Sequence, residues 1–160
     1  MVNRREGKVH YWLMKSEPEC YSIDDLKNDK KTMWDGVRNY QVRNMIRDDM
    51  KVGGLVLFYN SNSTPIGVVG IMKIIKTAYP DPTQFDMHSE HPDLASSPDN
   101  PRWFAVDVAF VEKFPRMITL NEIKLDSKLM SMVVAQKGSR LSISPVREEH
   151  FKRVIKLANT

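Results

Sequence analysis

The stretch WFAVDVAFVEKF at residues 103–114 decides the fold class of this 160-residue chain. Its apolar residues Phe104, Val106, Val108 and Phe110 occupy alternate positions. Successive side chains of a strand point to opposite faces of a sheet, so this period of two predicts a strand with one apolar face. It is the longest strand that we expect in the chain.

Shorter strands are predicted on both sides of this stretch. They cover residues 9–15, 55–59, 66–75 and 138–144. In the segment 9–15, apolar residues occupy both sets of alternate positions, which indicates a strand covered on both faces. Gly67 and Gly70 indicate a bulge or a close approach of two backbones within their strand.

Short helices are predicted between the strands. One begins at Ser22, whose hydroxyl can cap it, and another covers about residues 39–50 with basic residues on its outer side. A third opens at Thr119, because Glu122 follows at the spacing of a capping box. A weaker helical signal lies at 129–133. The closing helix is expected to bury Phe151, Val154, Ile155 and Ala158.

The number and order of these elements favour an α+β fold. Strands interrupted by short helices, rather than alternating with long ones, predict a curved five- to six-stranded mixed sheet forming a small barrel with short flanking helices. Residues 77–101 hold five prolines and no apolar periodicity, which predicts a long loop. We expect a single domain at 9–158, preceded by a flexible basic tail at 1–8.

The composition narrows the functional classes. Lys and Arg number 24 against 20 Asp and Glu, a net charge of +4 that suits a polyanionic partner but is common in other proteins. Cys20 is the only cysteine, which excludes an intrachain disulfide and favours a reducing compartment, nuclear or cytoplasmic. No apolar run approaches the roughly 18 residues of a membrane span, and the N-terminus is not typical of a secretory signal.

Catalytic signals are weak in this sequence. Nothing places a histidine beside Cys20, and His88 and His91 fall in a proline-rich loop rather than on a helix that would aim them at a metal. The pair Gly53-Gly54 lacks the spacing and the lysine of a phosphate-binding loop. We therefore predict no catalytic residue, no metal site and no cofactor.

Binding of a nucleobase is better supported. Aromatic, amide and basic residues gather in the segments 12–18, 34–44 and 58–62, at predicted strand ends and turns. A base needs a flat apolar face for stacking and a few polar groups for its edge. Trp34 stands beside Asp35-Gly36 in a predicted turn, outside any periodic apolar pattern, which favours it as the platform. The arginines available for phosphate are Arg38, Arg43, Arg47, Arg102 and Arg140.

The same segments resemble the EVE domain family. The motifs run in order along the chain: YWLMKSEP at 11–18, YSIDDL at 21–26, WDGVRNYQ-x-RN at 34–44, FY-x-SN at 58–62, AYPD at 78–81, PRW at 101–103, and G-x-RLS at 138–142. The resemblance implies a PUA-like fold related to the YTH readers of methylated RNA. It also implies recognition of a modified base, cytosine derivatives especially, in DNA or RNA.

The resemblance also implies which residues bind the base. Together with the reading of the segments, it predicts a base-binding set of Lys15, Ser16, Glu17, Trp34, Asn39, Tyr40, Asn60, Ser61, Asn62 and Ser142. Two positions depart from the family pattern. Asn60 stands where members usually have histidine, and residues 134–137 replace a run that usually contains arginine.

We therefore hypothesise a non-enzymatic reader of modified DNA or RNA, with no membrane association and a monomeric state favoured. One alternative is an enzyme acting on a modified nucleoside or RNA with Glu17 or Asp35 as its acid-base group, which requires a carboxyl with a raised pKa. The other is a protein-binding adaptor, which would show an exposed apolar patch and no salt-dependent affinity for nucleic acid.

Overall fold

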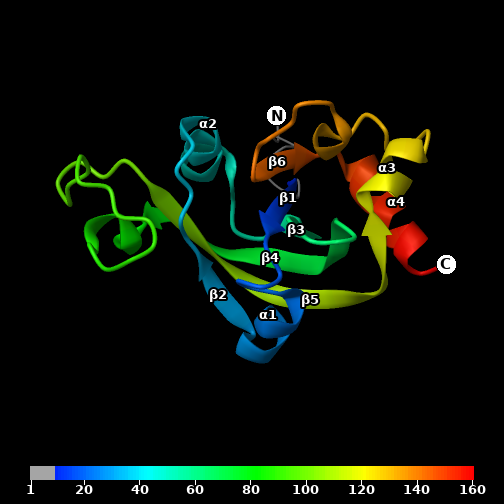
Figure 1. Ribbon diagram of the computed structural model, residues 1–160, viewed down its shortest axis with the longest axis horizontal. Helices are drawn as coiled ribbons and strands as arrows, with labels where there is room; N and C mark the ends of the chain where they lie inside the picture. The colour runs from blue at the N-terminus through cyan, green and yellow to red at the C-terminus, as the bar shows by residue number, and fades with distance from the viewer. Residues whose placement is uncertain (1–9) are drawn as a thin grey trace, which may run out of the picture.

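A computed structural model describes residues 10–160 of the chain. The predicted tail at 1–8 lies outside these residues. Figure 1 shows a curved sheet that runs through the centre, with short helices around it and the 81–103 segment projecting at the left. Among the described residues, no helix combines the length and the apolar character needed to cross a membrane.

The sheet has six strands and is mixed, as the sequence predicts. They are β1 (Tyr11–Ser16), β2 (Lys31–Trp34), β3 (Leu55–Asn60), β4 (Gly67–Pro80), β5 (Phe104–Thr119) and β6 (Ile143–Val146). Their order is β2-β5-β4-β3-β1-β6, with β1 and β3 parallel and the other pairs antiparallel. No ladder in the described part of the chain joins the edge strands β2 and β6. The sheet therefore curves without closing into the barrel that we expected.

The helices are short, and two of them begin where the capping signals at Ser22 and Thr119 predict. They are α1 (Ile23–Asp29), α2 (Tyr40–Asn44), the π-helical turn η1 (Met45–Asp49), the 3-10 turn η2 (Pro82–Phe85), α3 (Leu120–Leu125), the 3-10 turn η3 (Val133–Ala135) and α4 (Glu148–Ala158). Ser22 caps α1 in a complete capping box with Asp25. The hydroxyl of Thr119 accepts the N–H of Glu122 at 3.1 Å and so caps α3.

Both faces of the sheet are buried, each against its own helices. Trp12 and Met14 of β1 belong to a core cluster that includes residues of α1 and α2, whereas Leu13 belongs to a second cluster with residues of α3 and α4. The alternation confirms the prediction of a first strand covered on both faces. In the closing helix, the structure buries Phe151, Val154 and Ala158 and leaves Ile155 partly exposed.

Several element boundaries differ from the prediction. The four residues of β2 (Lys31–Trp34) were not expected, because so short an edge strand carries no readable period. β4 continues to Pro80 by pairing with the start of β5, so the predicted loop begins later than residue 77. β5 continues past Pro115, which is tolerated because no ladder partner is recorded between Lys113 and Ile118. β6 begins at Ile143 rather than at 138.

Gly67 and Gly70 mark the close backbone contact that the sequence predicts. A Cβ at Gly67 would lie 2.3 Å from the carbonyl oxygen of Ile118, and one at Gly70 would lie 2.4 Å from that of Glu112. The β4–β5 register shifts between Val68 and Gly70. These two glycines therefore let the longest strands approach each other where the sheet bends.

Gly67→Ala is expected to lower the free energy of unfolding by about 1–3 kcal/mol, because the new methyl group overlaps backbone that cannot move aside. Urea unfolding measures the change. Lys73→Ala, at an exposed position of the same strand, is the control and should change stability by less than about 0.5 kcal/mol. Equal stability of Gly67→Ala and the wild type would contradict the proposed contact.

Candidate functional site

A cavity of about 390 Å³ is lined by residues from the end of β1 and from the edge strand β2, which are not neighbours in the sheet. Its volume falls in the range of about 300–1,000 Å³ that is common for small-ligand pockets. The lining residues are Lys15, Ser16, Tyr21, Thr32, Met33, Trp34 and Asp35. The cavity thus combines an indole with hydroxyl groups, one amine and one carboxylate.

Trp34 forms an aromatic part of the cavity wall. It is the last residue of β2, pairs with Val106 of β5 and is partly buried. Its ring meets that of Phe58 edge-on, with the centroids 5.8 Å apart and the planes at 88°. Phe58 is fully buried, so the core fixes the indole while the indole still borders the cavity. This is the arrangement that a stacking platform requires.

The end of β1 brings several predicted residues together through backbone hydrogen bonds. The N–H of Ser61 donates to the carbonyl of Ser16 at 2.9 Å, and the N–H of Lys15 donates to the carbonyl of Ser142 at 2.8 Å. The hydroxyl of Ser16 donates to the carbonyl of Tyr21 at 2.6 Å, which closes the turn between them. The predicted group of Lys15, Ser16, Ser61 and Ser142 is therefore contiguous.

Asn60 lies opposite Ser16 in the β1–β3 register. Its carboxamide oxygen is buried and has no hydrogen-bond partner among the described residues. An unpaired buried acceptor costs about 1–3 kcal/mol, which a donor from a ligand or a water would recover. The residue that departs from the family pattern is thus an unsatisfied polar group that pairs with Ser16 in the sheet, although it does not itself line the cavity.

Lys15 is a partly buried cation. Burial lowers the pKa of its amine, and its Nζ lies 5.8 Å from the centroid of the Tyr59 ring. Among residues 10–160, no carboxylate comes within 4.0 Å of this amine. A partly desolvated cation without a counter-ion favours an anionic partner such as a phosphate.

Glu17 and Asn62 lie outside the lining of the cavity. Glu17 is exposed, and its carboxylate lies 3.7 Å from the thiol of Cys20. Asn62 is exposed in the loop after β3 with a φ of 49°. Desolvation and the neighbouring carboxylates, Glu17 first, raise the pKa of Cys20, so the thiol is not activated as a nucleophile.

The turn that follows Trp34 is held by a fully buried carboxylate, that of Asp81. It accepts the N–H of Gly36 at 2.8 Å, Nη1 of Arg38 at 3.0 Å, and both the N–H and the hydroxyl of Thr83. Burial opposes ionisation, but these hydrogen bonds outweigh it and lower the pKa of Asp81. Gly36 has the positive φ, 79°, that the sequence predicts for this turn.

Arg38 is a structural residue rather than the phosphate ligand that we predicted. Its guanidinium donates to Asp81, to the hydroxyl of Thr83 and to the carbonyls of Val37 and His91. These bonds use donors that a phosphate would need. The sequence does not indicate this role, because Asp81 and Thr83 lie more than 40 positions away from Arg38.

Asn39 and Tyr40 belong to a second cluster, at the start of α2. The side-chain oxygen of Asn39 accepts the N–H of Val42 at 3.0 Å and caps the helix. Tyr40 is half exposed and packs on Trp103 with the ring centroids 4.8 Å apart, while the Arg43 guanidinium lies 4.7 Å from the Tyr40 centroid. Of the ten predicted base-binding residues, the structure places Lys15, Ser16 and Trp34 at the cavity and Asn39 and Tyr40 in this α2 cluster. The other five line neither: Glu17, Asn60, Ser61, Asn62 and Ser142.

The other predicted phosphate ligands differ in whether their guanidinium groups are already bonded within the protein. Arg43 donates to the carbonyl of Arg102 and to the side chain of Asn44, which ties the α2 cluster to the 81–103 segment. Arg47 pairs with Asp48. Arg140 is exposed, two residues before the Ser142 carbonyl that binds the β1 backbone.

A larger hollow lies elsewhere and has a different chemistry. It measures about 870 Å³ between η1, the start of β1 and the start of α4. Its walls carry four acidic residues, Asp48, Asp49, Glu148 and Glu149. The Lys and Arg residues in the same walls are two, Lys51 and Arg147. An acidic wall repels a polyanion, so size alone does not identify the site. In the described part of the chain, no group of three or more potential metal ligands occurs, and His88 and His91 form none.

Comparison with known proteins identifies the family of this chain. Residues 10–157 match the EVE domain. The chain belongs to the EVE domain family. Human thymocyte nuclear protein 1 is 45% identical to this EVE domain over 166 residues, which cover 92% of the chain and 73% of the human protein.

Two solved structures show how closely the fold is shared. The human THYN1 protein in complex with 5-methylcytosine containing DNA gives a TM-score of 0.88 at 43% identity, covering 95% of this chain and 99% of that one. A protein from Leishmania major gives a TM-score of 0.91 at 40% identity and covers 98% of both chains. The family resemblance drawn from the motifs is therefore confirmed.

Three lining residues of this EVE domain were missed by the sequence reasoning. Thr32 and Met33 belong to the unpredicted edge strand β2, so no pattern pointed to them. Tyr21 entered the sequence reasoning only as the first residue of the YSIDDL motif at 21–26. Its hydroxyl in fact donates to Asp29 at 2.8 Å while the residue borders the cavity.

Asp81→Asn is expected to lower the free energy of unfolding by about 3 kcal/mol at pH 7, because it leaves Arg38 without its buried partner. The folded-state pKa of Asp81 is lowered, so the carboxylate stabilises fully above its unfolded pKa of about 3.9. That contribution is lost as the pH falls through the folded value. Urea unfolding should therefore show the wild-type advantage at neutral pH and a smaller one below about pH 4.

Asp99→Asn is the control for this variant, because Asp99 is exposed in the same segment. It should change stability by less than about 0.5 kcal/mol at either pH. A gap between the wild type and Asp81→Asn that is the same at both pH values would contradict the role given to the Asp81 charge.

Proposed function

We propose that this EVE domain is a non-enzymatic module that binds a modified base of DNA, a cytosine derivative, in the 390 Å³ cavity. The observation that carries the proposal is the Trp34 indole at the wall of that cavity. The human relative, 43% identical, was crystallised with 5-methylcytosine containing DNA. The thymocyte nuclear protein relatives also support a nuclear location for this chain.

In this proposal the base leaves its stack and lies against Trp34. Extruding a base costs a few kcal/mol, and stacking on an aromatic ring returns roughly 1–3 kcal/mol. The proposal assigns the polar edge of the base to Ser16, which lines the cavity, and to Ser61, whose N–H donates to the Ser16 carbonyl. Asn60 adds a carboxamide whose oxygen lacks a partner.

The flanking phosphates are assigned to cations on two sides of the cavity. Lys15 and Arg140 lie on the side of β6, since the backbone of Lys15 is bonded to Ser142. Arg43 and Tyr40 lie on the side of α2 and offer a guanidinium beside a half-exposed ring. Phosphate contacts of this kind position the nucleic acid, whereas contacts inside the cavity specify the base.

One observation favours the enzymatic alternative and defines its test. Burial, followed by the charge of Asp81, raises the pKa of Asp35 at the cavity wall, as an acid-base group requires. Incubation of the protein with oligonucleotides containing 5-methylcytosine, followed by nucleoside mass analysis, separates the two functions. A reader returns the oligonucleotide intact, and an enzyme returns a changed base.

Trp34→Ala is expected to weaken binding of a 5-methylcytosine oligonucleotide by about 1–3 kcal/mol and to remove its preference over unmodified cytosine. The loss follows because the variant removes the stacking face. Fluorescence anisotropy with matched labelled oligonucleotides measures both quantities. Tyr40→Ala is the matched control, since it removes an aromatic ring outside the cavity. It should weaken binding of both oligonucleotides alike. Unchanged discrimination in Trp34→Ala would exclude this cavity as the base site.

Lys15→Gln is expected to weaken binding of modified and plain oligonucleotides equally. The slope of log affinity against log salt should fall by about one, because one phosphate contact is lost. The measurement is a salt titration of affinity. Lys73→Gln, at an exposed position of β4, should leave the slope unchanged. An unaltered slope in Lys15→Gln would show that its amine does not contact phosphate.

A further inference from the structure

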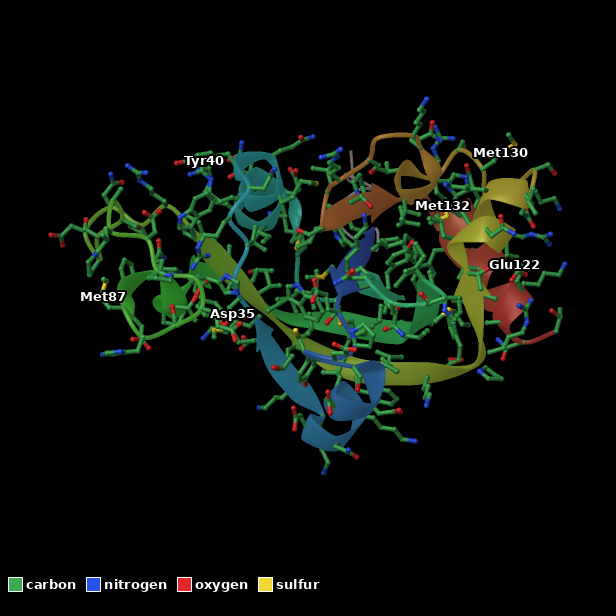
Figure 2. All side chains as sticks on the ribbon, viewed as in Figure 1. Asp35, Tyr40, Met87, Glu122, Met130 and Met132 are labelled. Carbon is green, nitrogen blue, oxygen red and sulfur yellow. The ribbon has the colours of Figure 1, made fainter. Side chains whose placement is uncertain are left out.

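Asp35 is the only carboxylate among the residues that line the cavity. It directly follows the Trp34 platform and precedes Gly36, whose N–H is bonded to Asp81 at 2.8 Å. Figure 2 shows Asp35 where β2 meets the 81–103 segment, away from Tyr40 on α2. Both chain neighbours of Asp35 are fixed, so its backbone has a defined position at the wall.

The nearby cations do not neutralise this carboxylate. Within residues 10–160, no salt bridge involves Asp35, because the guanidinium of Arg38 is bonded to Asp81. Burial and then the Asp81 charge raise the pKa of Asp35, while its own N–H, His91 and Arg38 act in the opposite direction. Within the described residues, the carboxylate accepts its own backbone N–H and has no salt-bridge partner, so a donor on a ligand would stabilise its charged form further.

We propose that Asp35 determines the specificity of the cavity by accepting a hydrogen bond from the exocyclic amine of an aminopyrimidine. The proposal rests on the function proposed above and narrows its ligand class. Cytosine and its 5-substituted derivatives carry an amine at position 4. Asp and Glu carboxylates accept a hydrogen bond from this amine. Thymine carries the same 5-methyl group as 5-methylcytosine but presents a carbonyl oxygen at position 4, which a carboxylate repels. The cavity thus selects the amine and not only the methyl group.

Glu17, the carboxylate that the sequence suggested for this amine, is less suitable. Both carboxylates are exposed, but Glu17 lies outside the lining of the cavity and is hydrogen-bonded to the Cys20 thiol, whereas Asp35 lines the cavity. The side chain of Glu17 is also one methylene longer. Glu17 and Asp35 are therefore a natural pair for experiment, since the two carboxylates differ in whether they border the cavity.

The experiment compares three oligonucleotides that carry 5-methylcytosine, cytosine or thymine at one position opposite an abasic site, so that base pairing does not contribute. Affinities are measured for the wild type, Asp35→Asn, Asp35→Ala and Glu17→Gln. The wild type should prefer 5-methylcytosine over thymine. Asp35→Asn should reduce that preference at least about tenfold, because a carboxamide can donate to the thymine carbonyl. Asp35→Ala should lose affinity for 5-methylcytosine without gaining any for thymine, and Glu17→Gln should match the wild type.

The possible failures are distinguishable. If the wild type binds 5-methylcytosine in a Trp34-dependent manner but Asp35→Asn keeps the wild-type preference, the role of Asp35 is wrong and the reader function stands. A loss of preference in Glu17→Gln alone would assign the amine to Glu17 and overturn the proposal. If the wild type does not distinguish 5-methylcytosine from cytosine or thymine, the reader function itself fails. Thermal unfolding of each variant confirms that the comparison is made on folded protein.

Discussion

The buried carboxylate of Asp81 is the interaction on which the cavity depends. It joins the Gly36 N–H to the 81–103 segment across 45 positions of sequence, and it holds Arg38 in the same contact. A buried charge is tolerated only when several donors surround it, and Asp81 has donors from three residues. Since Gly36 lies two residues after Trp34, this network also sets where the indole stands.

The 81–103 segment is organised around buried polar side chains rather than an apolar core. Gln84 is almost fully buried and bonds the carbonyls of Asp81 and Trp103 through its nitrogen, while its oxygen accepts from Ser96, Arg102 and Trp103. A satisfied network of this kind gives one defined conformation. The segment that holds the turn after Trp34, through the Asp81–Gly36 hydrogen bond, is thereby ordered before a ligand arrives, which reduces the ordering cost of binding.

The features that the sequence predicted are local ones. Ser22 and Thr119 predict the starts of their helices, because each capping hydroxyl accepts a backbone N–H only three residues further along the chain. Gly67 and Gly70 predict a close contact between two backbones, because glycine weakens a strand and is found inside one mainly at a bulge or at such a contact. The family motifs pointed to Trp34 and Ser16, which the structure does bring together at one cavity. Local chemistry of this kind survives folding because its partners are neighbours in the chain.

The parts that could not be predicted depend on distant partners. Arginine is a common phosphate ligand, so the sequence favours this role for Arg38. Only the fold shows that its guanidinium N–H groups already donate to Asp81 and Thr83. Arg47 is paired with Asp48, its neighbour in the chain, so its charge is also partly neutralised. A count of basic residues therefore overstates the charge available to nucleic acid in this chain. Long-range attraction then contributes mainly to encounter, and selectivity has to come from the cavity. For that reason the groups within reach of the bound base, rather than the net charge of +4, decide what this domain recognises.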